Sequence, residues 1–173
     1  IVGATTRSYH GLLVAALHPP VERTVFVTKI DEEVEFSDGH VIKLGVNEYQ
    51  DGTIDPQGYT YLDSFSLEAD MPCFRYDLGD SLALEKRIWM EYGQNTTYVQ
   101  YTLHSTGEDG EASSRPLMLT LYPFCLFRDH HSTTQGAADW HFIVEGQGNS
   151  CRVRAYDGAP AYSITMGPFA HFT

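Results

Sequence analysis

Four consecutive side chains that carry charge or form hydrogen bonds, Arg128-Asp129-His130-His131, end the stretch from residue 117 to residue 131. Arginine is a multiple donor, a carboxylate accepts, and an imidazole does either. Held at the end of a strand, such groups could bind a polar ligand while they stay open to solvent or to another domain. The alternative is a plain ion pair between Arg128 and Asp129 at a sheet edge, which would contribute little to stability.

Metal and cofactor chemistry find little support in these residues. Two histidines and a carboxylate bind iron in some β proteins, but neighbouring strand residues point to opposite faces, so His130 and His131 should not converge on one ion. The three cysteines lack the spacing of metal ligands, and no glycine-rich phosphate loop opens a helix. We therefore expect neither a metal nor a cofactor.

Two further polar motifs could present groups to a ligand. Arg7, Tyr9 and His10 precede Gly11, a residue that permits close approach of the backbone. Alternatively, Arg7 caps carbonyl groups and Tyr9 fills the core. Gln57 and Tyr59 lie in a Pro-Gln-Gly-Tyr turn, where aromatic rings could stack on the apolar face of a sugar. Packing in the turn or the core would explain these two residues equally well.

The elements that must position these motifs are strands. Residues 117–122 and 82–92 alternate between apolar and polar side chains, which is the pattern of a strand with two different faces. Pro123 cannot donate to a ladder and so indicates an edge or a bulge. Residues 23–36 predict one long strand or two short ones, and Asp38-Gly39 predicts a hairpin to residues 41–44.

The whole chain accordingly predicts an all-β fold. No long helical periodicity is found, and many short strands separated by turn residues are typical of a sandwich or barrel. We expect residues 45–58 to form a loop and residues 59–67 to form a strand. We expect the acidic triplet of residues 31–33 to be a solvated face. The 173 residues fit one domain.

Charge and composition exclude several classes of partner. The formal net charge is −12, which opposes binding to nucleic acid or to an anionic membrane. No apolar run is long enough to span a membrane. Three cysteines distant in sequence suit a reduced, cytoplasmic protein. The 23 acidic residues guarantee some pair at the separation of glycosidase carboxylates, so their number identifies no catalytic pair.

Four segments together resemble the N-terminal domain of bacterial and archaeal glycogen debranching enzymes of the amylo-α-1,6-glucosidase type. They occur in the family's order and cover most of residues 1–131: RSYHGLLVAALHPPVERTVFVTKIDEEVE (7–35), DPQGYTYLDSF (55–65), LEKRIWMEYGQNTTYVQYTL (84–103) and LTLYPFCLFRDHH (119–131). One departure lies at Asp55, where the family pattern has a histidine. Any role of that histidine is therefore not carried over to this chain.

The resemblance implies an antiparallel β supersandwich of two large packed sheets, which in the family precedes an (α/α)₆ barrel that carries the catalytic carboxylates. We therefore expect residues 1–173 to form one non-catalytic domain of a cytoplasmic enzyme. Its partners would be that barrel and a branched α-glucan. The alternatives are an independent α-glucan-binding module and a purely structural domain. The candidate cleft residues are Arg7, Tyr9, His10, Gln57, Tyr59, Arg128, Asp129 and His131.

Overall fold

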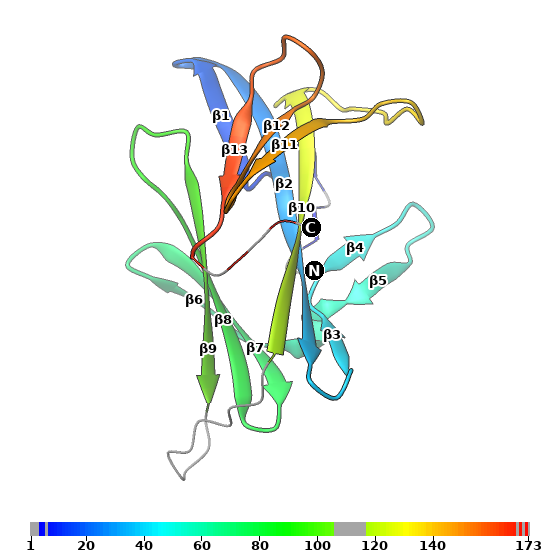
Figure 1. Ribbon diagram of the computed structural model, residues 1–173, viewed down its shortest axis with the longest axis vertical. Helices are drawn as coiled ribbons and strands as arrows, with labels where there is room; N and C mark the ends of the chain where they lie inside the picture. The colour runs from blue at the N-terminus through cyan, green and yellow to red at the C-terminus, as the bar shows by residue number, and fades with distance from the viewer. Residues whose placement is uncertain (1–3, 6, 106–116, 169, 171, 173) are drawn as a thin grey trace.

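The computed structural model describes residues 4–5, 7–105, 117–168, 170 and 172, and these residues are almost entirely β-strand (Figure 1). They contain one short 3₁₀ helix, η1 (Gly58–Tyr61), and no helix long and apolar enough to cross a membrane. The strands are β1 (Leu13–His18), β2 (Val21–Phe36), β3 (Val41–Lys43), β4 (Val46–Glu48), β5 (Ile54–Gln57), β6 (Leu62–Glu68), β7 (Met71–Gly79), β8 (Leu82–Met90), β9 (Thr97–Ser105), β10 (Leu117–Asp129), β11 (Ile143–Gln147), β12 (Ser150–Arg154) and β13 (Tyr162–Thr165). The expected all-β fold is confirmed.

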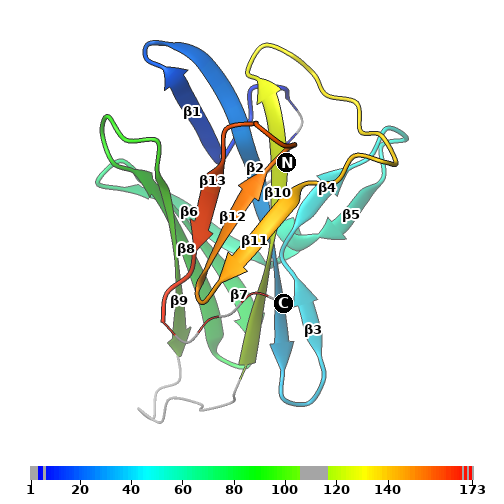
Figure 2. The same ribbon diagram turned by 45° about the horizontal axis from the view of Figure 1, so that its top comes forward.

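Within the described residues, all strand pairs are antiparallel, and they form four sheets. One sheet has the order β1-β2-β10, with β3 also paired to β2; a second has the order β6-β7-β8-β9. A three-stranded sheet contains β11, β12 and β13, and a two-stranded sheet contains β4 and β5. Figures 1 and 2 show β2 and β10 running through the middle of the molecule, with the other sheets arranged around them.

The long antiparallel pair of β2 and β10 positions the polar motif of residues 128–131, which lies at the end of β10. Leu117 pairs with Phe36 at one end and Asp129 with Thr24 at the other. The register shifts between Pro123 and Cys125, where proline cannot donate a ladder hydrogen bond. The predicted strand, the bulge at Pro123 and the edge position of β10 are therefore all confirmed.

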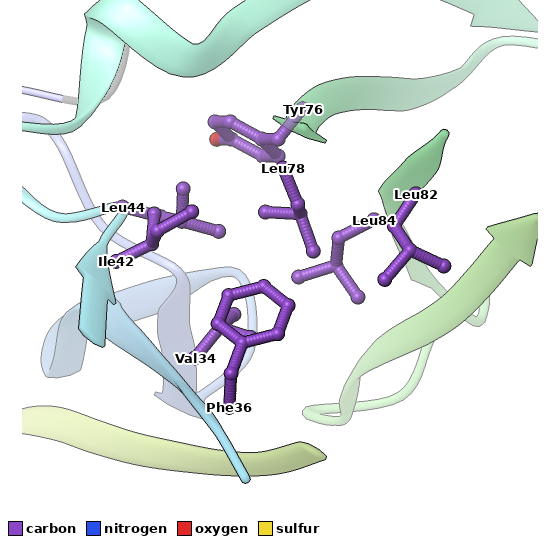
Figure 3. Packing of buried hydrophobic residues seen from close by; sticks show 8 residues of the cluster. All are labelled: Val34, Phe36, Ile42, Leu44, Tyr76, Leu78, Leu82 and Leu84. Carbon is purple, nitrogen blue, oxygen red and sulfur yellow. The ribbon is translucent and has the colours of Figure 1, made fainter. Parts of the chain in front are cut away.

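One hydrophobic core lies between the lower half of β2 and the β6–β9 sheet. Figure 3 shows its eight buried side chains, which come from β2, from β3 and the residue after it, and from β7 and β8. Val34 is fully buried, and Leu82 is 2 % exposed. Alternation along β2 and β8 turns these side chains to the inner faces. They are Val34, Phe36, Ile42, Leu44, Tyr76, Leu78, Leu82 and Leu84.

A second core lies where the β11–β13 sheet covers the upper half of β2 (Figure 2). The ring centroid of Phe26 lies 5.1 Å from that of Tyr162 on β13 and 5.7 Å from that of Phe127 on β10. Residues 24–27 of β2 are consecutively buried, so both faces of this half are covered. The upper end of β10 therefore pairs with β2 in one sheet, and its Phe127 shares the core that the third sheet covers.

Two expectations about residues 45–67 were wrong. Residues 45–58 are not wholly a loop, because β4 and β5 pair within them. Residues 59–61 are not strand but belong to η1, so Tyr59 and Tyr61 do not alternate along a sheet. Buried Gly58 explains the change of structure: it packs so closely on Leu44 that an added Cβ would lie 2.0 Å from the Leu44 carbonyl oxygen.

The acidic triplet Asp31-Glu32-Glu33 is not a solvated face, contrary to expectation. Glu32 is 2 % exposed, and its carboxylate pairs with Lys86 of the facing sheet. Glu33 points to the opposite face, where its carboxylate meets Lys43 at 3.0 Å. The three residues diverge as a strand requires, but a lysine neutralises each one.

Candidate functional site

Tyr9, His130 and His131 pack against one another at the end of β10 and are called the rim cluster below. The Tyr9 ring centroid lies 4.8 Å from that of His130 and 5.8 Å from that of His131, and the two imidazoles are 4.9 Å apart. The Tyr9 hydroxyl lies 3.4 Å from His131 Nδ1. Because Tyr9 is 56 % exposed, the cluster presents an aromatic face and polar edges at the surface.

Arg128 joins the two chain segments that make the rim cluster. Its Nη1 donates hydrogen bonds to carbonyl oxygens of the following residues, Asp129, His130 and Ser132, at 3.1, 3.3 and 3.0 Å. Its Nη2 donates to the carbonyl oxygen of Ser8, on the other segment. Backbone carbonyls therefore occupy most of the guanidinium, which fits a positioning role better than direct contact with a ligand.

Asp129 shapes the chain after Arg128 and makes no ion pair with it among the described residues. Its Oδ1 accepts a hydrogen bond of 2.8 Å from the backbone N–H of His131, which is the geometry of an Asx turn. The backbone N–H of His130 donates to the carbonyl oxygen of Arg23 on β2 at 2.9 Å. The position of both imidazoles is thus set by backbone hydrogen bonds as well as by Arg128.

Arg7 and His10 lie on the same turn as Tyr9. The His10 N–H donates to the Arg7 carbonyl oxygen at 3.0 Å, and both side chains are exposed. By contrast, Gln57 and Tyr59 flank buried Gly58 and lie elsewhere. Within the described part of the chain, no hydrogen bond or ring contact links either residue to the rim cluster. The structure therefore brings together the motif of residues 7–10 and the motif of residues 128–131. The motif that contains Gln57 and Tyr59 lies apart from them.

A cavity of about 510 Å³ opens beside the rim cluster. It exists because one edge of β2, the edge opposite β10, has a gap between its two partner strands. Along this edge β1 pairs with β2 as far as Val27, and β3 pairs with it from Glu33 onward. Between these partners, Thr28 to Glu32 line the cavity, and β7 and β8 form the opposite wall. Of the eight candidate residues, Tyr9 and His10 line this cavity.

A buried ion pair crosses the cavity wall from one sheet to the other. Lys86 Nζ lies 2.5 Å from Glu32 Oε1, and the two side chains are 11 % and 3 % exposed. The Tyr101 hydroxyl donates to the same oxygen at 2.6 Å. Glu32, Lys86 and Tyr101 are called the Glu32 group below. Burial, with the negative charge of Glu32 added to it, raises the pKa of the Tyr101 and Tyr76 phenols well above the ordinary value.

A second neutralised pair lines the cavity from the side of β2. Lys29 Nζ donates to Asp31 Oδ1 at 2.6 Å, to Asn47 Oδ1 at 2.6 Å and to the Val46 carbonyl oxygen at 2.9 Å. The Asn47 amide in turn donates to Asp31 Oδ2 at 3.1 Å. All three hydrogens of this ammonium group are therefore used, which fixes the β4 end of the cavity.

Little in the amino-acid sequence indicated the cavity. Lys86 interrupts the apolar face of its strand, and this was the one visible sign of a buried charge partner. Glu32 and Tyr76 carried no such sign, and His130 was not among the eight candidates although its ring packs on Tyr9. Across the described ranges, no three histidine, cysteine or acidic side chains are placed to hold a metal ion.

The family described as glycogen debranching enzyme N terminal matches residues 1–171. No curated protein and no solved structure was found to match the chain. The family match covers nearly the whole chain, including both rim motifs and every strand of the scaffold. The chain therefore belongs to the family of glycogen debranching enzyme N-terminal domains.

Proposed function

We propose that this chain packs on the catalytic barrel of a glycogen debranching enzyme and helps to shape the cleft that receives an α-1,6-branched glucan. The observation that carries this proposal is the rim cluster. Two segments more than 100 residues apart, joined by Arg128 and Ser8, place an exposed tyrosine beside two imidazoles. Tyrosine and histidine offer apolar faces and polar edges together, which suits contact with sugar rings or with another domain.

The chain has no catalytic role in this proposal. Asp129 accepts a backbone hydrogen bond, and Glu32 is buried in an ion pair, so neither is arranged as a free general acid or base. The catalytic carboxylates are assigned to the barrel, as the family resemblance implies. The three cysteines are unpaired, which supports a cytoplasmic location for the enzyme.

The proposal is tested in the enzyme in which this chain precedes its barrel. We expect His131→Ala and Tyr9→Ala each to lower kcat/KM for a branched glucan by about tenfold, equivalent to about 1.4 kcal/mol of transition-state stabilisation. The matched control is Tyr49→Ala, which removes an equally exposed tyrosine, 54 % against 56 %, from the β4–β5 turn. Unchanged kcat/KM in both rim variants would refute the proposal.

A purely structural domain predicts a different outcome for the same variants. In that case, the melting temperature of the enzyme falls while the activity of each folded molecule stays constant. Measuring active-site concentration alongside the rate separates the two cases. Our proposal requires that the activity of each folded molecule falls and that the melting temperature changes by no more than it does in the Tyr49→Ala control.

A further inference from the structure

Tyr76 places an unused hydroxyl in the wall of the cavity. Its side chain is 8 % exposed and lines the cavity from β7. Within the described ranges, no hydrogen bond to this hydroxyl is found. Figure 3 shows the hydroxyl directed away from Leu82 and Leu84 of the core. A phenol can donate one hydrogen bond and accept others, so Tyr76 offers a polar contact to a molecule in the cavity.

The Glu32 group has further capacity for hydrogen bonds on the same wall. Lys86 and Tyr101 both donate to Oε1 of Glu32. Among the described residues, the second oxygen, Oε2, has no partner, and two hydrogens of the Lys86 ammonium group have no oxygen acceptor. A carboxylate accepts several hydrogen bonds and an ammonium group donates three. This wall therefore offers both donors and an acceptor to a ligand.

The charges that line the cavity cancel. Lys29 is paired with Asp31 and Lys86 with Glu32, so the cavity favours neither sign of charge, in a chain whose net charge is −12. The remaining wall is mostly apolar or aromatic, with Phe74 of the facing sheet, and also contains the hydroxyl residues Thr5 and Thr28. A neutral ligand with several hydroxyl groups and an apolar face matches such a wall.

We propose that this cavity binds one hexopyranose unit of a neutral oligosaccharide, with Tyr76, Glu32 and Lys86 as its polar contacts. The Tyr76 hydroxyl and the Lys86 ammonium donate to sugar oxygens, and Glu32 Oε2 accepts from a sugar hydroxyl. Its volume, about 510 Å³, lies within the range of about 300–1,000 Å³ that is typical of small-molecule sites. Tyr9 and His10 lie at the exposed side of the cavity, where the other sugar units of the oligosaccharide would extend into solvent.

The test is a titration of the isotope-labelled 173-residue chain with maltose, followed by two-dimensional amide NMR. We expect shifts confined to the cavity wall, at residues 28–32, 74–76 and 86–88. Tyr76→Phe removes one hydroxyl without emptying space, and loss of one hydrogen bond should weaken binding about threefold to tenfold. Tyr122→Phe is the matched control, because that hydroxyl bonds Glu33 on the outer face; its binding should be unchanged.

A second pair of measurements probes charge and space. Glucuronate and glucosamine, which carry opposite charges, should both bind more weakly than methyl α-glucopyranoside, because the cavity is neutral. Thr5→Trp places a large ring at an exposed residue that lines the cavity and should abolish binding in a folded protein. Absence of maltose shifts, or equal affinity of the Tyr76→Phe variant and the unmodified chain, would overturn the proposal.

The choice of an α-glucan as the probe rests on the proposed function, but the two ideas fail separately. If the cavity does not bind sugar, maltose produces no shifts in the chain, while His131→Ala still lowers enzyme activity. If the rim has no role in the cleft, His131→Ala leaves activity unchanged, while maltose still shifts the cavity wall.

Discussion

Lys86 on β8 holds the carboxylate of Glu32 on β2 at 2.5 Å, across the space between two sheets. Each residue breaks the pattern of its own strand. Lys86 stands on an apolar face, and Glu32 belongs to an acidic triplet yet is 2 % exposed. Each buried charge is tolerable only because the other is present, since an isolated ion in this position would be strongly destabilising. The pair thus fixes how the two sheets face each other.

We expect Glu32→Gln and Lys86→Met each to lower the free energy of unfolding by about 3–5 kcal/mol, because each leaves one charged or polar group without its partner. The double variant should lose less than the sum of the two, and urea denaturation measures all three. The pair of Lys43 and Glu33, which is more exposed, is the control, with an expected cost of at most about 1 kcal/mol. Strictly additive losses at Glu32 and Lys86 would show that they do not interact.

Alkaline pH should destabilise the chain through its buried tyrosines. Burial raises the pKa of Tyr76, Tyr101 and Tyr162 above the ordinary 10.0. Because the folded pKa is the higher one, this contribution is complete below pH 10 and is lost as the pH rises above it. The free energy of unfolding should then fall by about 1.4 kcal/mol per pH unit for each of these tyrosines.

A spectrophotometric titration of tyrosinate checks this expectation. Of the 11 tyrosines, these three should ionise only as the chain unfolds. Tyr101→Phe should reduce the alkaline slope. A single titration near pH 10 by a chain that stays folded would contradict the burial of these phenols.

Arg128→Ala should lower the free energy of unfolding by about 2–4 kcal/mol, because hydrogen bonds from a charged donor to four carbonyl oxygens are lost. Arg128→Lys should recover only part of this, since an ammonium group lacks the planar fork of the guanidinium. The histidine NMR signals of the rim cluster should shift in both variants. Arg152→Ala, at an exposed position, serves as the control and should change stability by no more than about 0.5 kcal/mol.

Gly58→Ala should destabilise the chain by at least about 2 kcal/mol. The new Cβ would lie 2.0 Å from the Leu44 carbonyl oxygen, which is backbone and cannot move aside cheaply. Gly146→Ala is the matched control, because nothing lies within 4 Å of an added Cβ there. Thermal unfolding of the two variants compares them directly. Equal melting temperatures would mean that η1 does not pack on Leu44 as described.

The strands were predictable where one face meets a core. Alternation in residues 117–122 and 82–92 gave β10 and β8, and Asp38-Gly39 gave the hairpin between β2 and β3. Residues 59–61 were misassigned because tertiary packing of Gly58 on Leu44 outweighed the local strand preference of two tyrosines. That contact joins residues 14 positions apart, so no local pattern could reveal it.

The site was predictable only in its exposed parts. The motifs around Tyr9 and His131 contain residue types that rarely accumulate at random, so they were visible in the sequence. Their meeting depends on Arg128 reaching Ser8 across 120 residues, which spacing cannot show. The cavity was even less predictable from the sequence. It is formed by the part of β2 that lies between its partners β1 and β3, and by a lysine of another sheet.

The most direct test of the proposed function is hydrogen–deuterium exchange of this chain alone and in the enzyme that includes its barrel. Backbone amides of residues 8–11 and 129–132 should exchange more slowly when the barrel is present, because the rim cluster lies at the contact. The outer face of β8 and β9, where Glu85 meets Arg87 and His104, should exchange equally in both. Unchanged exchange at both rim segments, with protection elsewhere on the chain, would contradict the proposal.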